Sequence, residues 1–182
     1  PAGGMVKGCT TNPPLAYDAD KTDPDFWNEW IADSMHDRPD LDVKEIAWLT
    51  YEETIRRGAA IMLPIWEASN GRFGYISGQL DPRLFTEIDV MVAAAEELHA
   101  LSPNVMIKVP ASAEGITVLR ILASKGIGTN TTTCFTLPQI LASAQATREG
   151  VAMKQVGNYF TSEDVDLARW RAVITMMVGR LT

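Results

Sequence analysis

The feature of this sequence that most constrains its fold is a repeated alternation of short apolar runs with longer amphipathic segments. The apolar run 104–110 precedes a segment in which Val118, Ile121 and Leu122 recur at helical spacing. The run 126–132 precedes a second helical segment, residues 137–154. Short strands that alternate with helices predict a parallel sheet, because each crossover returns the chain to the same end of the sheet.

The rest of the chain extends this pattern. Further strands are expected at residues 5–10, 73–80 and 172–178, with an irregular turn after the first at Gly8 and residues 12–14. Helices are expected from Pro24, from a cap at Asp42 to an end at Gly58, and over residues 85–101. Residues 59–66 fit a helix or a strand, and the polar stretch 158–166 is interpreted as an insertion.

Two parallel architectures fit such an alternation, an open doubly wound sheet and a barrel. No glycine-rich phosphate fingerprint follows any of the expected strands, which favours the barrel. In a parallel barrel the functional residues gather at the carboxyl ends of the strands. Polar residues recur at those ends here, so we expect them to converge on one mouth: Thr10, Asn12, Gln79, Lys108, Asn130, Thr132 and Thr175.

Length and composition indicate one globular domain over residues 1–182. With 46% hydrophobic and 21% charged residues, the chain can bury a sizeable core. Its net charge of -7 argues against nucleic acid or an anionic membrane as the main partner. Cys9 and Cys134 show neither metal spacing nor a disulfide framework, so reduced, packed thiols are expected. Without an apolar run of membrane-spanning length or a signal peptide, a cytoplasmic protein is expected.

Lys108 is the candidate nucleophile, because it lies within an otherwise apolar strand. Lysine is seldom buried, and desolvation lowers its pKa, which frees the amine lone pair for attack on a carbonyl. Two structural alternatives remain at this point. The side chain can extend its ammonium group to solvent, or it can pair with a carboxylate.

Two motifs carry a resemblance to a known family. Residues 8–13, Gly-Cys-Thr-Thr-Asn-Pro, and residues 105–112, Val-Met-Ile-Lys-Val-Pro-Ala-Ser, resemble the two signatures of the transaldolases, in their order and context. Residues 76–83, 126–132 and 173–180 support the resemblance, which covers nearly the whole chain. These are class I Schiff-base enzymes on a (β/α)8 barrel, so the resemblance implies that fold.

The resemblance also implies an activity. Transaldolases transfer a dihydroxyacetone unit from a ketose phosphate, such as fructose 6-phosphate or sedoheptulose 7-phosphate, to an aldose phosphate in the pentose phosphate pathway. Lys108 would form the Schiff base, with no metal and no cofactor, and small sugar phosphates would be the partners. The resemblance does not fix the oligomeric state, and it is compatible with a homo-oligomer.

Site residues are carried over from the matching positions of the family. Asn12 and Asn130, together with Thr10, would bind the hydroxyl groups of the substrate. Thr132 would hold a proton-shuttling water, and Thr175 occupies a position where the family usually has a serine. Arg180 would bind the phosphate group. Each has a structural alternative. Asparagine or threonine at a strand end often satisfies backbone groups of a turn, and Arg180 could form an ion pair at the rim. Asp81 and Arg83 are interpreted as structural partners, and neither His36 nor His99 is assigned a role.

Two positions depart from the transaldolase pattern. Gln79 stands where transaldolases have a glutamate, and glutamine cannot act as a general base. The related fructose 6-phosphate aldolases have glutamine there, yet their sixth-strand tyrosine corresponds here to Met177. Aldol cleavage and non-catalytic sugar-phosphate binding are therefore the alternatives to transfer.

The resemblance further predicts that the barrel is incomplete in this chain. The family's first strand, with its acid/base aspartate, should precede Pro1, and its last two strands should follow Thr182. A complete barrel of this type needs about 250 residues. We therefore expect two exposed hydrophobic edges of the sheet.

Overall fold

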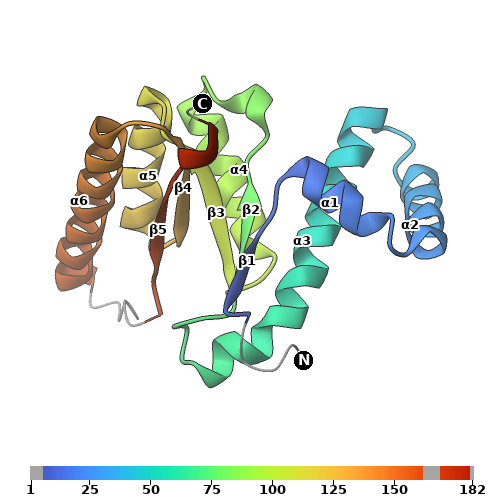
Figure 1. Ribbon diagram of the computed structural model, residues 1–182, viewed down its shortest axis with the longest axis horizontal. Helices are drawn as coiled ribbons and strands as arrows, with labels where there is room; N and C mark the ends of the chain where they lie inside the picture. Colours follow the sequence, from blue (N-terminus) through green and yellow to red (C-terminus); the bar gives the residue numbers. More distant parts are fainter. Residues whose placement is uncertain (1–5, 162–168, 181–182) are drawn as a thin grey trace.

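The computed structural model describes residues 6–161 and 169–180, which form a single parallel sheet flanked by helices (Figure 1). Its strands lie side by side in chain order, each paired with the next. They are β1 (Gly8–Thr10), β2 (Tyr75–Gln79), β3 (Val105–Pro110), β4 (Thr129–Cys134) and β5 (Ala172–Met176). This curled half-barrel confirms the expected incomplete (β/α)8 barrel.

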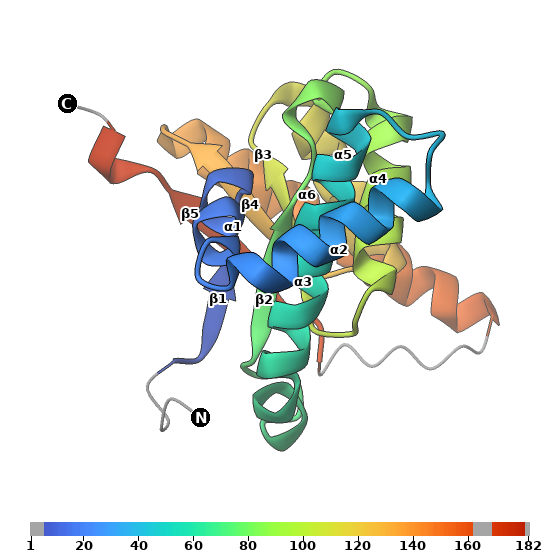
Figure 2. The same ribbon diagram turned by 90° about the vertical axis from the view of Figure 1, so that its right-hand side faces the viewer.

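Helices fill the connections between the strands. They are α1 (Pro13–Asp20), α2 (Pro24–Asp37), α3 (Val43–Ala68), α4 (Ile88–Ala100), α5 (Ala113–Lys125) and α6 (Leu137–Thr161), with short 3-10 helices η1 (Pro82–Leu84) and η2 (Val178–Arg180). Helices α3, α4, α5 and α6 pack on the strands, whereas α1 and α2 contact α3 and lie to one side of the sheet (Figures 1 and 2).

The core lies between the sheet and its helices. Because strand side chains alternate between the two faces, Val105, Ile107 and Val109 of β3 point into this core, where each is at most 1% exposed. The residues between them, including Lys108, point to the opposite, concave face. The alternation along β3 therefore sets Lys108 inside the curl of the sheet.

Helix α3 corrects two boundaries predicted from the sequence. Gly58 does not end the helix, and residues 59–66 are its continuation, not a separate element. The reason is packing: Ile55, Ala59, Met62 and Trp66 recur at helical spacing and are all buried. The cap predicted at Asp42 is confirmed, and the structure adds Glu45 as its reciprocal partner in a capping box.

Other boundaries also differ from the prediction. The residues after Asn12 form helix α1 instead of an irregular turn, because Asn12 caps the helix and Pro13 suits its first position. Strand β4 begins only at Thr129, since Gly126 ends α5 in the left-handed conformation with φ 77°. The expected insertion at 158–166 begins inside helix α6, and its residues 162–166 lie outside the described part of the chain, as does residue 5.

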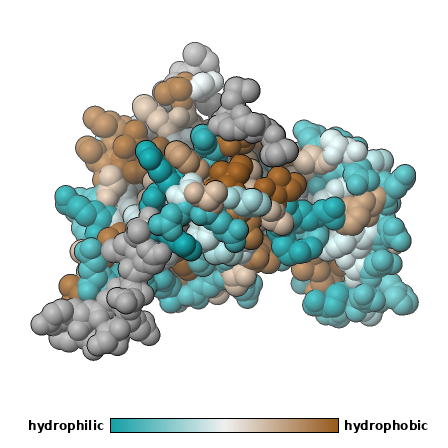
Figure 3. Space-filling model, turned by 90° about the horizontal axis from the view of Figure 1, so that it is seen from below, coloured by the Kyte–Doolittle hydropathy of each residue, from teal (hydrophilic) through white to brown (hydrophobic). Residues whose placement is uncertain are grey.

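Both edges of the sheet, β1 and β5, lack a neighbouring strand among the described residues. Val173 and Met176 of β5 are 44% and 45% exposed. The exposed apolar edge is therefore confirmed for β5. Viewed from the amino ends of the strands, apolar surface is interspersed with hydrophilic surface (Figure 3).

Candidate active site

The strand register brings three predicted site residues into one row. Gln79 of β2 is paired with Lys108 of β3, which is paired with Asn130 of β4. Paired residues of neighbouring strands share a face of the sheet, and the strands lie about 4.8 Å apart. The three side chains therefore start from the same level of the concave face, near the carboxyl ends of their strands.

Lys108 is half-buried on this face. Its Nζ atom donates a hydrogen bond to the backbone oxygen of Thr11 at 3.2 Å. Within residues 6–161 and 169–180, Lys108 forms no ion pair, so the alternative of a carboxylate partner is not observed. Burial without a counter-charge lowers the pKa of the Lys108 ammonium below its ordinary value of 10.5.

Asn130 of β4 is held by two side chains, one from β2, across β3, and one from the neighbouring strand β5. It is 6% exposed, its Nδ2 atom donates to Ser77 Oγ at 3.0 Å, and its Oδ1 atom accepts from Thr175 Oγ1 at 2.9 Å. This arrangement fixes the orientation of the amide beside Lys108. Thr175 thus contacts a predicted binding residue, and Ser77 is a site residue that sequence reasoning missed. Its signal was its place two residues before Gln79, on the same face of the strand.

Thr132 lies at the end of β4, opposite Pro110, and is 7% exposed. Its neighbour Thr133 has a φ of 55°, an uncommon conformation for a β-branched residue. The pairing of β4 with β5 is irregular at this point, between Thr131 and Cys134. The backbone is therefore strained where β4 reaches the mouth.

A glutamine outside the predicted set fixes the loops around Thr133. Gln139 Nε2 donates to the backbone oxygens of Ala111 at 3.1 Å and Thr133 at 3.3 Å. Its Oε1 atom accepts from the backbone nitrogens of Phe135 and Thr136. One side chain of α6 thereby ties the loop after β3 to the loop after β4, a role that no local sequence pattern indicated.

The remaining predicted residues are less closely joined to the row. Asn12 Oδ1 accepts from the backbone nitrogen of Leu15 at 2.9 Å, so it satisfies a backbone group as its structural alternative states, but as the cap of a helix and not in a turn. Thr10 is exposed on β1 and paired with Ser77. Arg180 ends η2, but its side chain lies outside the described residues. A hydrophobic Met177 follows β5, its backbone nitrogen bonded to Cys134 oxygen at 2.8 Å.

Below the row, the concave face is hollowed by a cavity of about 360 Å³. Ser77 and Asn130 line it together with Tyr75, Met106 and Val173. Cationic side chains also border it, from Lys7, Arg72 and Arg171. Lys7, Arg72 and Arg171 precede β1, β2 and β5, so this hollow lies toward the amino ends of the strands, away from the mouth.

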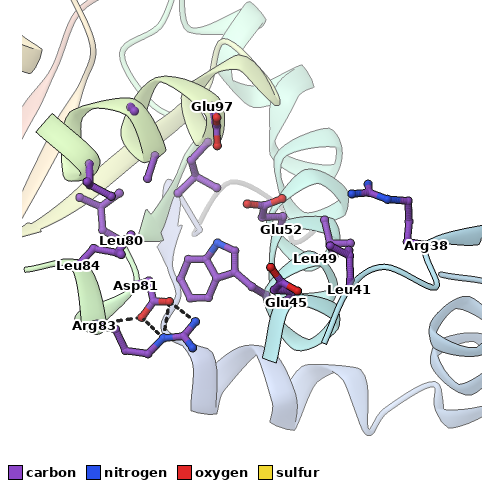
Figure 4. A pocket seen from close by; sticks show the side chains of 15 residues that line it. Arg38, Leu41, Glu45, Leu49, Glu52, Leu80, Asp81, Arg83, Leu84 and Glu97 are labelled. Atoms are coloured by element: carbon purple, nitrogen blue, oxygen red, sulfur yellow. Dashed lines mark hydrogen bonds and ion pairs between the residues drawn. The ribbon is translucent and has the colours of Figure 1, made fainter. Parts of the chain in front are cut away.

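A second cavity of about 430 Å³ lies on the outer side of the sheet, between α3 and α4 (Figure 4). Its apolar lining includes Leu49 and Leu80, and Glu52 and Glu97 face it (Figure 4). Burial foremost, and then the nearby charge of Glu97, raises the pKa of Glu52. The cavity contains none of the predicted site residues. At its rim Arg83 forms an ion pair with Asp81, which confirms their structural pairing.

The structure describes the surroundings of both cysteines and of His99. Both thiols are free, but Cys9 is exposed, so the expectation that both are packed is wrong for Cys9, because edge strand β1 has no outer neighbour among the described residues. His99 Nδ1 lies 3.0 Å from the backbone oxygen of Val105.

No cluster of three or more metal-ligating side chains was found among the described residues. None of the described helices could span a membrane.

The sequence of this chain is similar to a known protein family and to several of its curated members. A family model described as transaldolase/fructose-6-phosphate aldolase matches residues 2–182. The chain is 29% identical over 178 residues to a transaldolase of Thiobacillus denitrificans, covering 97% of this chain and 47% of that protein. It is 30% identical over 178 residues to transaldolase 1 of Streptomyces avermitilis, covering 97% and 45%. The chain thus spans about half the length of the curated relatives that it matches.

Proposed function

Because this chain belongs to the transaldolase/fructose-6-phosphate aldolase family, we propose that it carries the Schiff-base lysine of a transaldolase. The proposed reaction moves a dihydroxyacetone unit from a ketose phosphate to an aldose phosphate, as a step of the pentose phosphate pathway in the cytoplasm. One observation carries the proposal: Lys108 is half-buried between Gln79 and Asn130 with a lowered pKa and no carboxylate partner among the described residues.

In the first step, the neutral amine of Lys108 attacks the ketose carbonyl, and loss of water leaves an iminium ion. The iminium nitrogen accepts the electron pair of the C3–C4 bond as that bond breaks. The proton of the C4 hydroxyl leaves at the same time, so an aldose phosphate departs and an enamine remains on Lys108. Attack of this enamine on an acceptor aldehyde, followed by hydrolysis, completes the transfer.

The other residues of the row would bind and orient the substrate. The Asn130 amide, fixed by Ser77 and Thr175, can offer hydrogen bonds to a hydroxyl group near Lys108. Gln79 can donate and accept hydrogen bonds but cannot remove a proton. Proton transfer is therefore assigned to a water held by Thr132. Phosphate binding is assigned to Arg180, which follows the carboxyl end of β5.

Gln79 also favours a second candidate, aldol cleavage without an acceptor. In that reaction the enamine on Lys108 is protonated at carbon to an iminium ion, and water hydrolyses this ion to dihydroxyacetone and the free amine. Incubation with fructose 6-phosphate and erythrose 4-phosphate distinguishes the two reactions. Sedoheptulose 7-phosphate indicates transfer, and free dihydroxyacetone indicates cleavage.

The proposal is tested by borohydride trapping with fructose 6-phosphate on the longest available form of the protein, followed by peptide mass mapping. We expect the reduced adduct on Lys108 and none in Lys108→Met. Lys125→Met is the matched control, because Lys125 is a surface lysine paired with Glu96 at 2.8 Å, and it should retain capture. Capture that persists in Lys108→Met refutes the Schiff-base role. Reversible binding by calorimetry, with no adduct and no product, supports the non-catalytic alternative.

A further inference from the structure

A buried tyrosine of helix α3 reaches the carboxyl ends of β1 and β2. Tyr51 is 4% exposed, and its ring packs on Trp48 with a centroid distance of 4.9 Å. Its hydroxyl oxygen lies 2.7 Å from the backbone nitrogen of Gln79 and 2.8 Å from Thr11 Oγ1. A phenylalanine would fill the same space, so the hydroxyl group is there for its hydrogen bonds.

The direction of these hydrogen bonds follows from counting protons. The backbone N–H of Gln79 can only donate, so the Tyr51 oxygen accepts from it. Thr11 Oγ1 donates its one proton to the backbone oxygen of Ser77 at 3.0 Å. The Tyr51 hydroxyl must therefore donate to Thr11. Burial raises the pKa of Tyr51, so this phenol keeps its proton.

The chain of bonds reaches two segments next to the candidate nucleophile, one after β1 and one in β2. The carbonyl oxygen of Thr11 accepts the hydrogen bond of Lys108 Nζ at 3.2 Å, and Gln79 is paired with Lys108 in the neighbouring strand. The hydroxyl of Tyr51 thus joins two segments that are 68 residues apart in sequence, both in contact with or beside Lys108. Without it, the Gln79 N–H would lose its acceptor and the Thr11 side chain one of its two partners.

We propose that Tyr51 is a positioning residue, which holds the Thr11 carbonyl and Gln79 in register with Lys108. This inference rests on the proposed function and deepens it, since Tyr51 would act on the reaction only through Lys108 and Gln79. Small displacements of reacting groups cost large factors in rate while substrate affinity changes little. The predicted signature is therefore a loss in kcat with KM nearly unchanged.

The test compares Tyr51→Phe, Thr11→Val and the double variant, using the rate of borohydride-trapped adduct and steady-state turnover. Each single variant should lower kcat by roughly tenfold to a hundredfold. The double variant should be no slower than either single one, because both remove the same chain of bonds. Thr11→Ser keeps the hydroxyl and should restore the rate. Tyr17→Phe, at an exposed tyrosine of α1, is the matched control and should leave both parameters unchanged.

Each outcome decides the inference. If Tyr51→Phe still captures substrate at Lys108 with unchanged kcat and KM, the inference is overturned while the proposed function stands. The same conclusion follows if the losses in kcat of the two single variants add fully in the double variant. Should Tyr51→Phe fail to fold, the comparison of Thr11→Val with Thr11→Ser decides, and equal rates refute the inference. Absence of any adduct in the unaltered protein overturns the proposed function and the inference with it.

Discussion

Replacing Gly115 with alanine should weaken the fold where helix α5 meets the end of β3. Gly115 lies in the first turn of α5, capped by the side chain of Ser112. A Cβ atom at this position would stand 1.9 Å from the carbonyl oxygen of Pro110. Contacts to a Cβ atom essentially never fall below 3.0 Å, so the helix and the strand must separate by about 1 Å.

The expected loss of stability follows from two opposed effects. Forced overpacking costs about 1–3 kcal/mol, and the upper end, about 3 kcal/mol, applies here because the clash is with a backbone atom that cannot rotate away. The better helix propensity of alanine returns at most about 1 kcal/mol. The net destabilisation is therefore about 2 kcal/mol, which lowers the Tm of a chain of this size by about 4–8 °C.

Urea unfolding and thermal melting measure this loss, and borohydride capture reports its effect on Lys108. Gly150→Ala is the matched control, because its Cβ atom would meet the backbone oxygen of Arg120 at 2.2 Å, between α5 and α6 and away from the site. Both variants should lose stability, but only Gly115→Ala should capture more slowly once folded. A free energy of unfolding in Gly115→Ala within about 0.5 kcal/mol of the unaltered protein would refute the reasoning.

Three further predictions follow from burial. Folding lowers the pKa of Lys108, so between the lowered pKa and 10.5 the folded state binds fewer protons and the free energy of unfolding rises with pH. Lys108→Met should flatten that rise in urea unfolding at a series of pH values, and an unaltered slope would contradict it. Asn104→Ala leaves the buried oxygens of Ala59 and Gly74 without their donor and should cost about 2–3 kcal/mol by the same assay. Leu119→Ala leaves a cavity at a fully buried position and should lower the free energy of unfolding by about 3–5 kcal/mol. A decrease of less than about 1 kcal/mol would contradict this prediction.

Local sequence patterns correctly predicted the helices and strands whose apolar residues recur at regular spacing or whose ends carry capping residues. Val105, Ile107 and Val109 alternate into the core as the apolar pattern of their strand predicts. Asp42 and Glu45 form the capping box that their spacing allows. The prediction failed at Gly58, where a residue typical of helix ends lies inside one. There the packing of Ala59, Met62 and Trp66 outweighs the local preference of glycine, since tertiary burial contributes more than propensity.

For the candidate site, too, some features follow from the sequence and others only from the tertiary structure. The sequence by itself determined that Gln79, Lys108 and Asn130 lie near the ends of successive parallel strands, because that follows from the alternation of strands with helices. Only the tertiary structure decided that Ser77 and Thr175 fix Asn130, and that Tyr51 reaches from α3 to Thr11 and Gln79. Those contacts join residues between 28 and 53 positions apart, and they depend on register and helix packing, which no local pattern of residue types encodes.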